Sequence, residues 1–116
     1  MFPTKKLPDS DRFSWTNHAQ NKMQHYQLSV NRVKRVTLHP DRIEYGVAPK
    51  TIAVMQTSGT KKHPYEIWTM YQLISKKTML SGQKFKIISA WRYPGISPRD
   101  KAIPIPDDIK KELGIE

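Results

Sequence analysis

Residues 13–40 carry hydrophobic and polar positions with the period of a helix, in two segments. An apolar stripe at helical spacing predicts the first helix, with the members Trp15, Ala19, Met23 and Tyr26. Gln27-Leu28-Ser29 breaks the pattern, and Ser29 fits a helix N-cap because its hydroxyl can accept a backbone N–H. A second helix follows, with a buried face of Val30, Val33 and Val36, and ends at His39-Pro40 because proline disfavours a helical residue before it.

Four strand-like runs follow the helices, at Arg42–Val47, Thr51–Thr57, Tyr65–Ser75 and Lys84–Tyr93. The first run alternates with a period of two, which places Ile43, Tyr45 and Val47 on one face. The second and third runs are apolar on both faces, which indicates a sheet that is at least partly covered on both sides. In the last run, simple alternation sets Phe85, Ile87 and Trp91 opposite Ile88 and Ala90.

These segments predict an α+β fold in which an N-terminal two-helix hairpin packs on a four-stranded antiparallel sheet. Residues 1–12 are expected to form a flexible leader, residues 13–93 one domain, and residues 94–116 an extended Pro-rich tail. Within the tail, Asp107 can cap a short helix from Asp108 to Leu113, which Gly114 ends. We expect the tail to cover part of the sheet face opposite the hairpin.

The charge balance narrows the class of partner. Twenty Lys and Arg residues against ten Asp and Glu give a formal net charge of +10, which attracts polyanions such as nucleic acid. A basic surface without a polyanion partner is the alternative. The absence of cysteine excludes a disulfide framework, a thiolate metal site and a cysteine nucleophile. No apolar run has membrane-spanning length and the N-terminus lacks a signal-peptide core, so we expect a cytoplasmic protein without membrane contact.

Four residues are candidates for chemistry on RNA. Metal-independent cleavage needs a base, an acid and positive charge near the phosphorane. His18, Lys22 and His25 share one helical face at i, i+4 and i+7, and Arg92 could join them at one phosphate. Each also has a plainer role. We prefer an anchoring role for His18, whereas Lys22 and His25 are more often solvated and Arg92 can stack on its aromatic neighbours.

Other basic and aromatic residues are candidates for nucleic-acid contacts: Lys34, Arg35, Lys61, Lys62, Lys76, Lys77 and Tyr93. Lysines in loops are usually solvated, and an aromatic residue in a strand often packs in the core instead of stacking on a base. The spacing of the four histidines is not that of a compact ligand set, and no cysteine supports them, so we expect neither a metal nor a cofactor.

Short motifs in this chain resemble a widespread bacterial family. Thr16-Asn17-His18-Ala19, Leu28-Ser29 and His39-Pro40-Asp41, followed by strands that end in Ile87-Ile88-Ser89-Ala90-Trp91, are similar to the pattern of BrnT-type toxins in the RelE-like group of small ribonucleases. The resemblance covers about residues 13–93. The chain departs from the family at Lys22, at Tyr26-Gln27 and in its Pro-rich tail; the family usually has Arg at the first position and Arg-Gly at the second. The resemblance implies a RelE/BrnT-like fold, cleavage of messenger RNA, and neutralisation by an antitoxin.

Together, the charge and the resemblance predict a small basic protein directed at RNA or the ribosome. Two alternatives stay open. One is a metal-independent endoribonuclease toxin of a toxin–antitoxin pair, and the other is a non-catalytic module that binds RNA, the ribosome or a protein. A clustered acid–base pair in a concave site distinguishes the first from the second. The sequence names no target RNA, antitoxin or oligomeric state.

Overall fold

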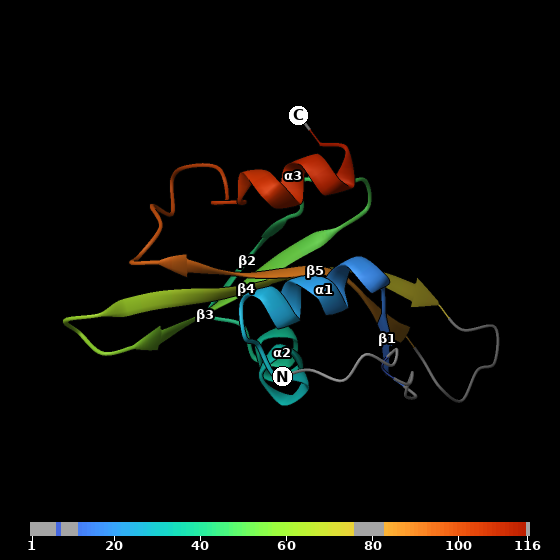
Figure 1. Ribbon diagram of the computed structural model, residues 1–116, viewed down its shortest axis with the longest axis horizontal. Helices are drawn as coiled ribbons and strands as arrows, with labels where there is room; N and C mark the ends of the chain where they lie inside the picture. The colour runs from blue at the N-terminus through green and yellow to red at the C-terminus, as the bar shows by residue number, and fades with distance from the viewer. Residues whose placement is uncertain (1–6, 8–11, 76–82, 116) are drawn as a thin grey trace.

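The computed structural model describes Leu7, residues 12–75 and residues 83–115, and contains one mixed sheet with helices on both faces (Figure 1). The strands are β1 (Phe13–Trp15), β2 (Arg42–Tyr45), β3 (Ile52–Gly59), β4 (Pro64–Ser75) and β5 (Gln83–Pro94). Their order in the sheet is β1-β5-β4-β3-β2. The helices are α1 (Asn17–His25), α2 (Val30–Leu38) and α3 (Asp107–Leu113). The predicted α+β class is confirmed.

The four predicted strands form and are antiparallel to one another, but the prediction of a four-stranded, wholly antiparallel sheet is wrong, because a fifth strand runs along the edge of the sheet. β1 lies parallel to β5, with Phe13 opposite Phe85. Its two aromatic residues, Phe13 and Trp15, are buried, as expected for alternate positions of a strand. Trp15 also fits the helical stripe by spacing, but Thr16 accepts the Ala19 N–H at 3.0 Å and so caps α1 after it.

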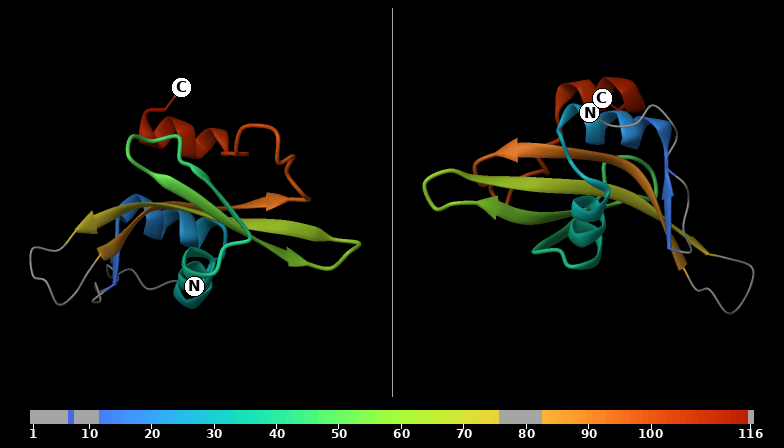
Figure 2. Two further views of the ribbon diagram at one scale, coloured as in Figure 1. Left: turned by 180° about the vertical axis from the view of Figure 1, so that it is seen from behind. Right: turned by 60° about the horizontal axis from the view of Figure 1, so that its bottom comes forward.

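Both N-terminal helices exist, but they do not pack as the hairpin that was predicted. α1 lies along β5, whereas α2 lies across β3 and β4 (Figures 1 and 2). Ser29 caps α2 as predicted, by accepting the Arg32 N–H at 3.1 Å, and the helix ends before His39. Gln27 has a positive φ of 57°, which turns the chain between the two helices. The helices therefore diverge to cover different strands.

Two apolar cores lie on opposite faces of the sheet. The first core, under α1 and α2, consists of Phe13, Trp15, Ala19, Met23, Leu28, Val33, Val36, Val54, Ile67, Tyr71, Ile87 and Ala90. The second core, under α3 and the chain that leads to it, consists of Ala53, Met55, Trp68, Met70, Trp91, Ile103 and Ile109. This arrangement confirms that β3 and β4 are apolar on both faces and that the tail covers the sheet face opposite α1 and α2.

A register shift in β5 overturns the predicted faces of that strand. Met70 lies opposite Ser89 and Tyr71 opposite Ile87, so Ile88 has no partner across the ladder. An extra residue of this kind inverts the alternation on either side of it. Ile87 and Ala90 consequently face the first core, and Ile88 and Trp91 face the second.

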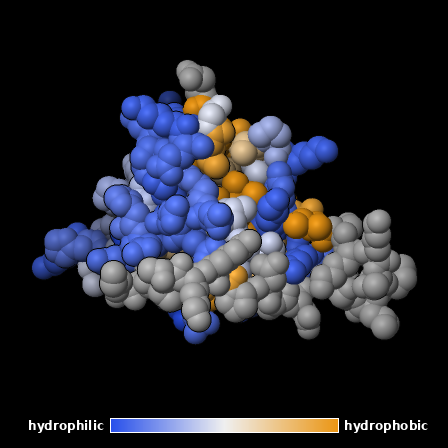
Figure 3. Space-filling model, turned by 45° about the vertical axis from the view of Figure 1, so that its right-hand side comes forward, coloured by the Kyte–Doolittle hydropathy of each residue, from blue (hydrophilic) through white to orange (hydrophobic). Residues whose placement is uncertain are grey.

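The apolar face of β2 points into solvent. Ile43 is 66% exposed and Tyr45 is 92% exposed, although their alternation is typical of a half-buried strand. Arg42 is buried in their place, with its guanidinium 5.3 Å from the Trp68 ring centre. Apolar side chains also reach the surface on the side shown in Figure 3, where they form a strip between hydrophilic ones.

A buried polar network fixes the chain between β5 and α3. The fully buried Glu66 carboxylate accepts hydrogen bonds from Trp68 Nε1 at 3.0 Å, from Ser97 N at 3.0 Å and from Ser97 Oγ at 2.6 Å. Arg42 Nη1 donates to Ser97 Oγ at 3.0 Å. α3 then begins at Asp107 without a side-chain cap, so the predicted capping role of Asp107 is wrong.

Candidate functional site

Two of the three predicted catalytic residues of α1, His18 and Lys22, lie against α3. Lys22 Nζ contacts Asp108 Oδ2 at 2.8 Å and Glu112 Oε2 at 2.7 Å, and only 7% of Lys22 is exposed. His18 Nδ1 lies 3.3 Å from Glu112 Oε1, and His18 Nε2 lies 2.9 Å from Ser89 Oγ. We call these four ionisable residues, His18, Lys22, Asp108 and Glu112, the α3 clamp.

The electrostatics of the α3 clamp favour the charged form of Lys22 and the neutral form of His18. Burial lowers the pKa of Lys22, but hydrogen bonds to Asp108 and Glu112 outweigh it, so this pKa is raised. The Asp108 pKa is lowered, because Lys22 outweighs the opposite effect of burial. Burial, assisted by the Lys22 charge and opposed by Glu112, lowers the pKa of His18. A lysine held by two carboxylates joins α1 to α3 and leaves no open anion site at this place.

The other two predicted catalytic residues lie apart from the clamp. His25 is exposed, and its ring packs edge-on against Tyr26 with 4.7 Å between ring centres. Arg92 Nη2 donates to the Tyr26 carbonyl oxygen at 3.3 Å, and its guanidinium carbon lies 4.6 Å from the centre of the Tyr65 ring. The predicted group of four therefore does not form one site: His18 and Lys22 belong to the clamp, Arg92 lies beside Tyr65, and His25 belongs to neither place.

The Tyr65 cluster consists of Ser58, Tyr65, Arg92 and Arg32. Hydrogen bonds with Ser58 and Arg92, together with the positive charges of Arg92 and Arg32, lower the pKa of the Tyr65 hydroxyl. Arg32 Nε is buried without a hydrogen-bond partner among the described residues. The ion pairs found in the same part of the chain involve neither Arg32 nor Arg92. The charges of two guanidiniums thus act on one phenol, and neither is paired with a carboxylate of the described residues.

Arg32 and Ser58 were missed as site residues. Strand register brings Ser58, Tyr65 and Arg92 together, since Ser58 lies opposite Tyr65, and Ile67, two residues further along β4, lies opposite Arg92. The sequence does not display this register.

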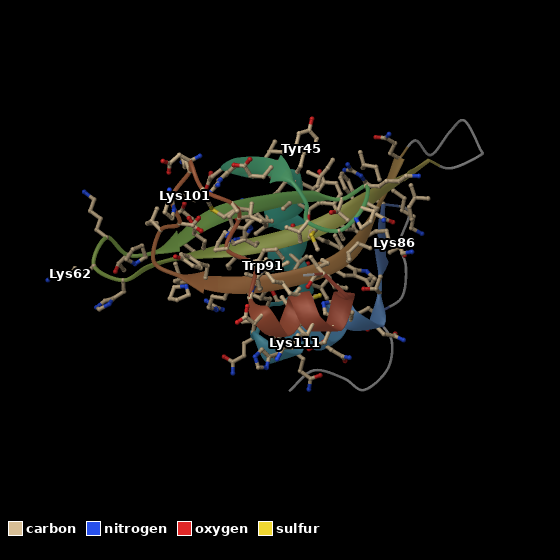
Figure 4. The ribbon with its side chains drawn as sticks, turned by 90° about the horizontal axis from the view of Figure 1, so that it is seen from above. Tyr45, Lys62, Lys86, Trp91, Lys101 and Lys111 are labelled. Carbon is tan, nitrogen blue, oxygen red and sulfur yellow. The ribbon has the colours of Figure 1, made fainter. Side chains whose placement is uncertain are left out.

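The predicted nucleic-acid contacts occupy several places. Lys61 and Lys62 are exposed in the turn between β3 and β4, which extends far from Lys86 at the other end of the sheet (Figure 4). Arg35 is exposed on α2, and Lys34 Nζ lies 5.4 Å from the centre of the Phe13 ring. Tyr93 is half-buried against the second core, away from the Arg92 side of the sheet. Lys76 and Lys77 lie outside the described residues.

The turn between β3 and β4 is ordered by its own hydrogen bonds. Thr60 N donates to the His63 carbonyl oxygen at 3.3 Å, and His63 N donates to Thr60 Oγ1 at 3.1 Å. Gly59 has a φ of 81°, and a Cβ there would lie 2.3 Å from the His63 oxygen. An open hollow of about 410 Å³ beside this turn is lined by Thr57, Ser58, Gly59, Thr60, Lys61, Pro64 and Ile96. The turn therefore presents Lys61 and Lys62 from a defined backbone, adjacent to the Tyr65 cluster.

Within the described residues, no three histidine, aspartate or glutamate side chains form a group that could hold a metal ion. None of the helices in that part of the chain is long and apolar enough to cross a bilayer. Comparison with protein-family models, curated proteins and solved structures finds no match to this chain. The BrnT/RelE resemblance consequently stays a prediction from the sequence.

Proposed function

We propose that this chain is a small basic protein that binds single-stranded RNA through the Tyr65 cluster and the β3–β4 turn. One observation carries the proposal: the Arg92 guanidinium lies over the Tyr65 ring, 4.6 Å from its centre, and neither Arg92 nor Arg32, whose charges both act on this phenol, has a carboxylate partner in the described part of the chain. Two like charges near one group repel each other, and a bound phosphate would replace that repulsion with attraction. The formal net charge of +10 supports the same class of ligand.

The geometry of Arg92 favours phosphate over a loosely held counterion. Its guanidinium is stacked on Tyr65 and tied to the Tyr26 carbonyl oxygen, so its orientation is restricted before any ligand arrives. A planar guanidinium matches two oxygens of a phosphate, and its restriction in advance lowers the entropic cost of binding. Lys61 and Lys62 would then contact neighbouring phosphates of the same strand as solvated point charges.

Salt titration tests this proposal directly. The logarithm of the association constant for a short single-stranded RNA should fall linearly with the logarithm of salt concentration, with a slope of ~0.7 per phosphate neutralised. Lys61→Glu/Lys62→Glu should weaken binding and reduce the slope by more than 1. The matched control is Lys101→Glu/Lys111→Glu, which makes the same change of charge at two exposed positions, one in the chain before α3 and one in α3. If the two double variants weaken binding equally, RNA affinity depends on net charge alone, and the proposal of a binding surface at the β3–β4 turn is wrong.

A second candidate function is RNA cleavage by a metal-independent endoribonuclease toxin that an antitoxin neutralises. The observation that favours it is the lowered pKa of Tyr65 beside Arg92, because such a phenol can exchange a proton and a guanidinium can stabilise a phosphorane. On this hypothesis the reaction takes place at the Tyr65 cluster, while His18 has the anchoring role preferred from the sequence.

Cleavage of a labelled RNA in the presence of a chelator separates these roles. Tyr65→Phe should reduce the rate ~10²–10⁴-fold at unchanged melting temperature if the phenol transfers a proton. His18→Ala should lower the melting temperature and leave the rate of the folded protein unchanged, since His18 joins α1 to β5 and α3. If His18→Ala instead abolishes cleavage by the folded protein and Tyr65→Phe does not, the catalytic residue lies on α1. Absence of cleavage by the wild type would leave RNA binding as the function.

A further inference from the structure

The strand β2 combines unused backbone groups with exposed apolar side chains. It stands last in the sheet, and among the described strands it pairs with β3 alone. Gly46 N donates to the Thr51 carbonyl oxygen at 2.8 Å, and in an antiparallel pair every second residue is bonded to its partner in this way. The even-numbered residues of β2 therefore bond to β3, whereas Ile43 and Tyr45 turn their N–H and C=O groups to the open edge. These four groups are available to another strand.

The same two residues supply apolar surface. Ile43 is 66% exposed and Tyr45 is 92% exposed, on the sheet face that carries the first core, since Ile43 lies opposite Val54. With Glu44 and Ile52 they line an open groove of about 280 Å³. A row of free backbone groups with apolar side chains at alternate positions is a template for strand addition. RNA has no N–H and C=O groups at the spacing of a strand, so this edge fits an extended polypeptide.

Positive charge flanks the edge of β2. Lys50 lies in the turn that follows β2, and Arg99 and Lys101 lie in the segment whose carbonyl oxygens accept from Arg42 Nη2 at 3.5 and 3.4 Å. These three basic residues are exposed, and none takes part in the ion pairs found among the described residues. Figure 4 shows Lys101 and Tyr45 on the same side of the molecule. A partner that carries carboxylates would complement this charge.

Charge also favours an acidic partner over a second copy of this chain. Each copy has a formal net charge of +10, so two copies repel each other. Of the acidic residues in and beside β2, Glu44 is already in an ion pair and Asp41 accepts the Thr57 N–H at 2.9 Å. A pairing of two β2 strands that sets Ile43 against Tyr45 also sets Glu44 against its own copy, and like charges directly opposite each other destabilise a strand pair.

We propose that β2 binds an extended, acidic segment of a protein partner, which joins the sheet as an additional antiparallel strand. Backbone hydrogen bonds to Ile43 and Tyr45 hold the segment, and its apolar side chains at alternate positions occupy the groove beside them. Carboxylates at the intervening positions point to the other sheet face, where Arg99 and Lys101 lie. This surface is separate from the proposed RNA surface, because the β3–β4 turn lies at the other end of β3, an eight-residue strand of roughly 25 Å.

Designed peptides test the charge of the partner. The probe is a fluorescent peptide of about nine residues, blocked at both ends, in which valine or tyrosine alternates with glutamate. The comparison peptide has lysine in place of every glutamate. Fluorescence anisotropy with the full chain at physiological salt should show at least about tenfold tighter binding of the glutamate peptide. Equal affinity for the two peptides, or no binding of the glutamate peptide, would overturn the proposal.

Methylation of backbone nitrogens tests whether the peptide binds as a strand. Residues directly opposite each other share a sheet face, so the valine and tyrosine N–H groups of the peptide face β2 and the glutamate N–H groups face solvent. Methylation of the valine and tyrosine nitrogens should therefore abolish binding. Methylation of the glutamate nitrogens is the matched control and should leave most of the affinity. An equal loss with both methylated peptides would contradict strand addition.

A double variant assigns the binding to β2. Ile43→Thr/Tyr45→Thr removes the exposed apolar groups but keeps residues that favour a strand, so it should weaken the glutamate peptide at least about tenfold at unchanged melting temperature. Ile96→Thr is the matched control, because Ile96 is 56% exposed and lies outside β2, and it should leave the affinity unchanged. Equal affinity of the double variant and the control would overturn the assignment. The methylated peptides provide the test if the double variant does not fold.

The same double variant distinguishes the other possible occupants of this edge. Analytical ultracentrifugation at micromolar concentration should show a monomer, and a dimer that Ile43→Thr/Tyr45→Thr dissociates would assign the edge to a second copy of the chain. The double variant should bind single-stranded RNA as tightly as the wild type does, and a loss of RNA affinity would assign the edge to RNA. Either of these two results would overturn the proposal. Peptide binding without RNA binding would support it and show that the proposed RNA-binding function is wrong.

Discussion

Glu66 offers the sharpest test of how the second core is assembled. Its carboxylate is fully buried and accepts three hydrogen bonds, from Trp68 Nε1, Ser97 N and Ser97 Oγ. Glu66→Ala leaves these donors without an acceptor in a site closed to water. Single bonds to a charged group are worth ~1.5–3 kcal/mol and are not additive, and breaking a buried charged network typically costs ~3–5 kcal/mol. We expect Glu66→Ala to lower the free energy of unfolding by ~3–5 kcal/mol.

Urea denaturation followed by tryptophan fluorescence measures this loss, because Trp68 lies in the network itself. The melting temperature should fall by roughly 12–20 °C, from about 4 °C per kcal/mol for a domain of this size. The free energy of unfolding of Glu66→Gln should lie between those of wild type and Glu66→Ala, since the amide keeps one acceptor oxygen but presents a donor to one of its neighbours. Asp100→Ala is the control, because Asp100 is exposed, and its free energy of unfolding should stay within about 0.5 kcal/mol of the wild-type value. A loss below about 1 kcal/mol for Glu66→Ala would refute the argument that this network anchors the chain before α3.

Three further predictions test other parts of the fold. Asp108→Asn should lower the free energy of unfolding by no more than about 1 kcal/mol at pH 6, because solvent screens this partly exposed carboxylate. Since the Asp108 pKa is lowered in the folded protein, the difference should begin to decrease as pH falls below about 4 and vanish only below the lowered pKa, in a series of urea denaturations. Gly59→Ala should lower the free energy of unfolding by more than about 1 kcal/mol in thermal melting, because Gly59 has a positive φ and the new Cβ would meet the His63 oxygen. Unchanged stability would contradict the described turn. Met23→Ala should cost ~2–5 kcal/mol in urea denaturation, as expected for a fully buried methionine, whereas a smaller loss would mean that the first core closes around the cavity.

Local signals were sufficient to predict much of this fold. Ser29 and His39-Pro40 mark the beginning and end of α2 because a cap and a proline act on neighbouring backbone groups. The apolar positions of β3 and β4 indicate a sheet covered on both faces, since both side-chain sets of a strand can be read from its alternation. The tail helix ends at Gly114, whose φ of 71° is the left-handed conformation that glycine favours.

The missed features depend on partners that are distant in sequence. β1 contains three residues and becomes a strand only because Phe85 and its neighbours pair with it. The bulge at Ile88 reverses the faces of β5, and nothing in the local alternation announces it. Lys22 has the spacing of a catalytic residue, but its partner Asp108 lies 86 positions further along the chain. The Tyr65 cluster likewise joins residues from β3, β4, β5 and α2, so its charge becomes visible only in three dimensions.

The position of α3 after all five strands has a consequence during synthesis on the ribosome. The strands that carry Trp68, Met70 and Trp91 emerge before the helix whose Ile109 covers them. Until α3 follows, the nascent chain displays one finished layer and one bare apolar sheet face, the kind of surface that associates with other chains or with chaperones.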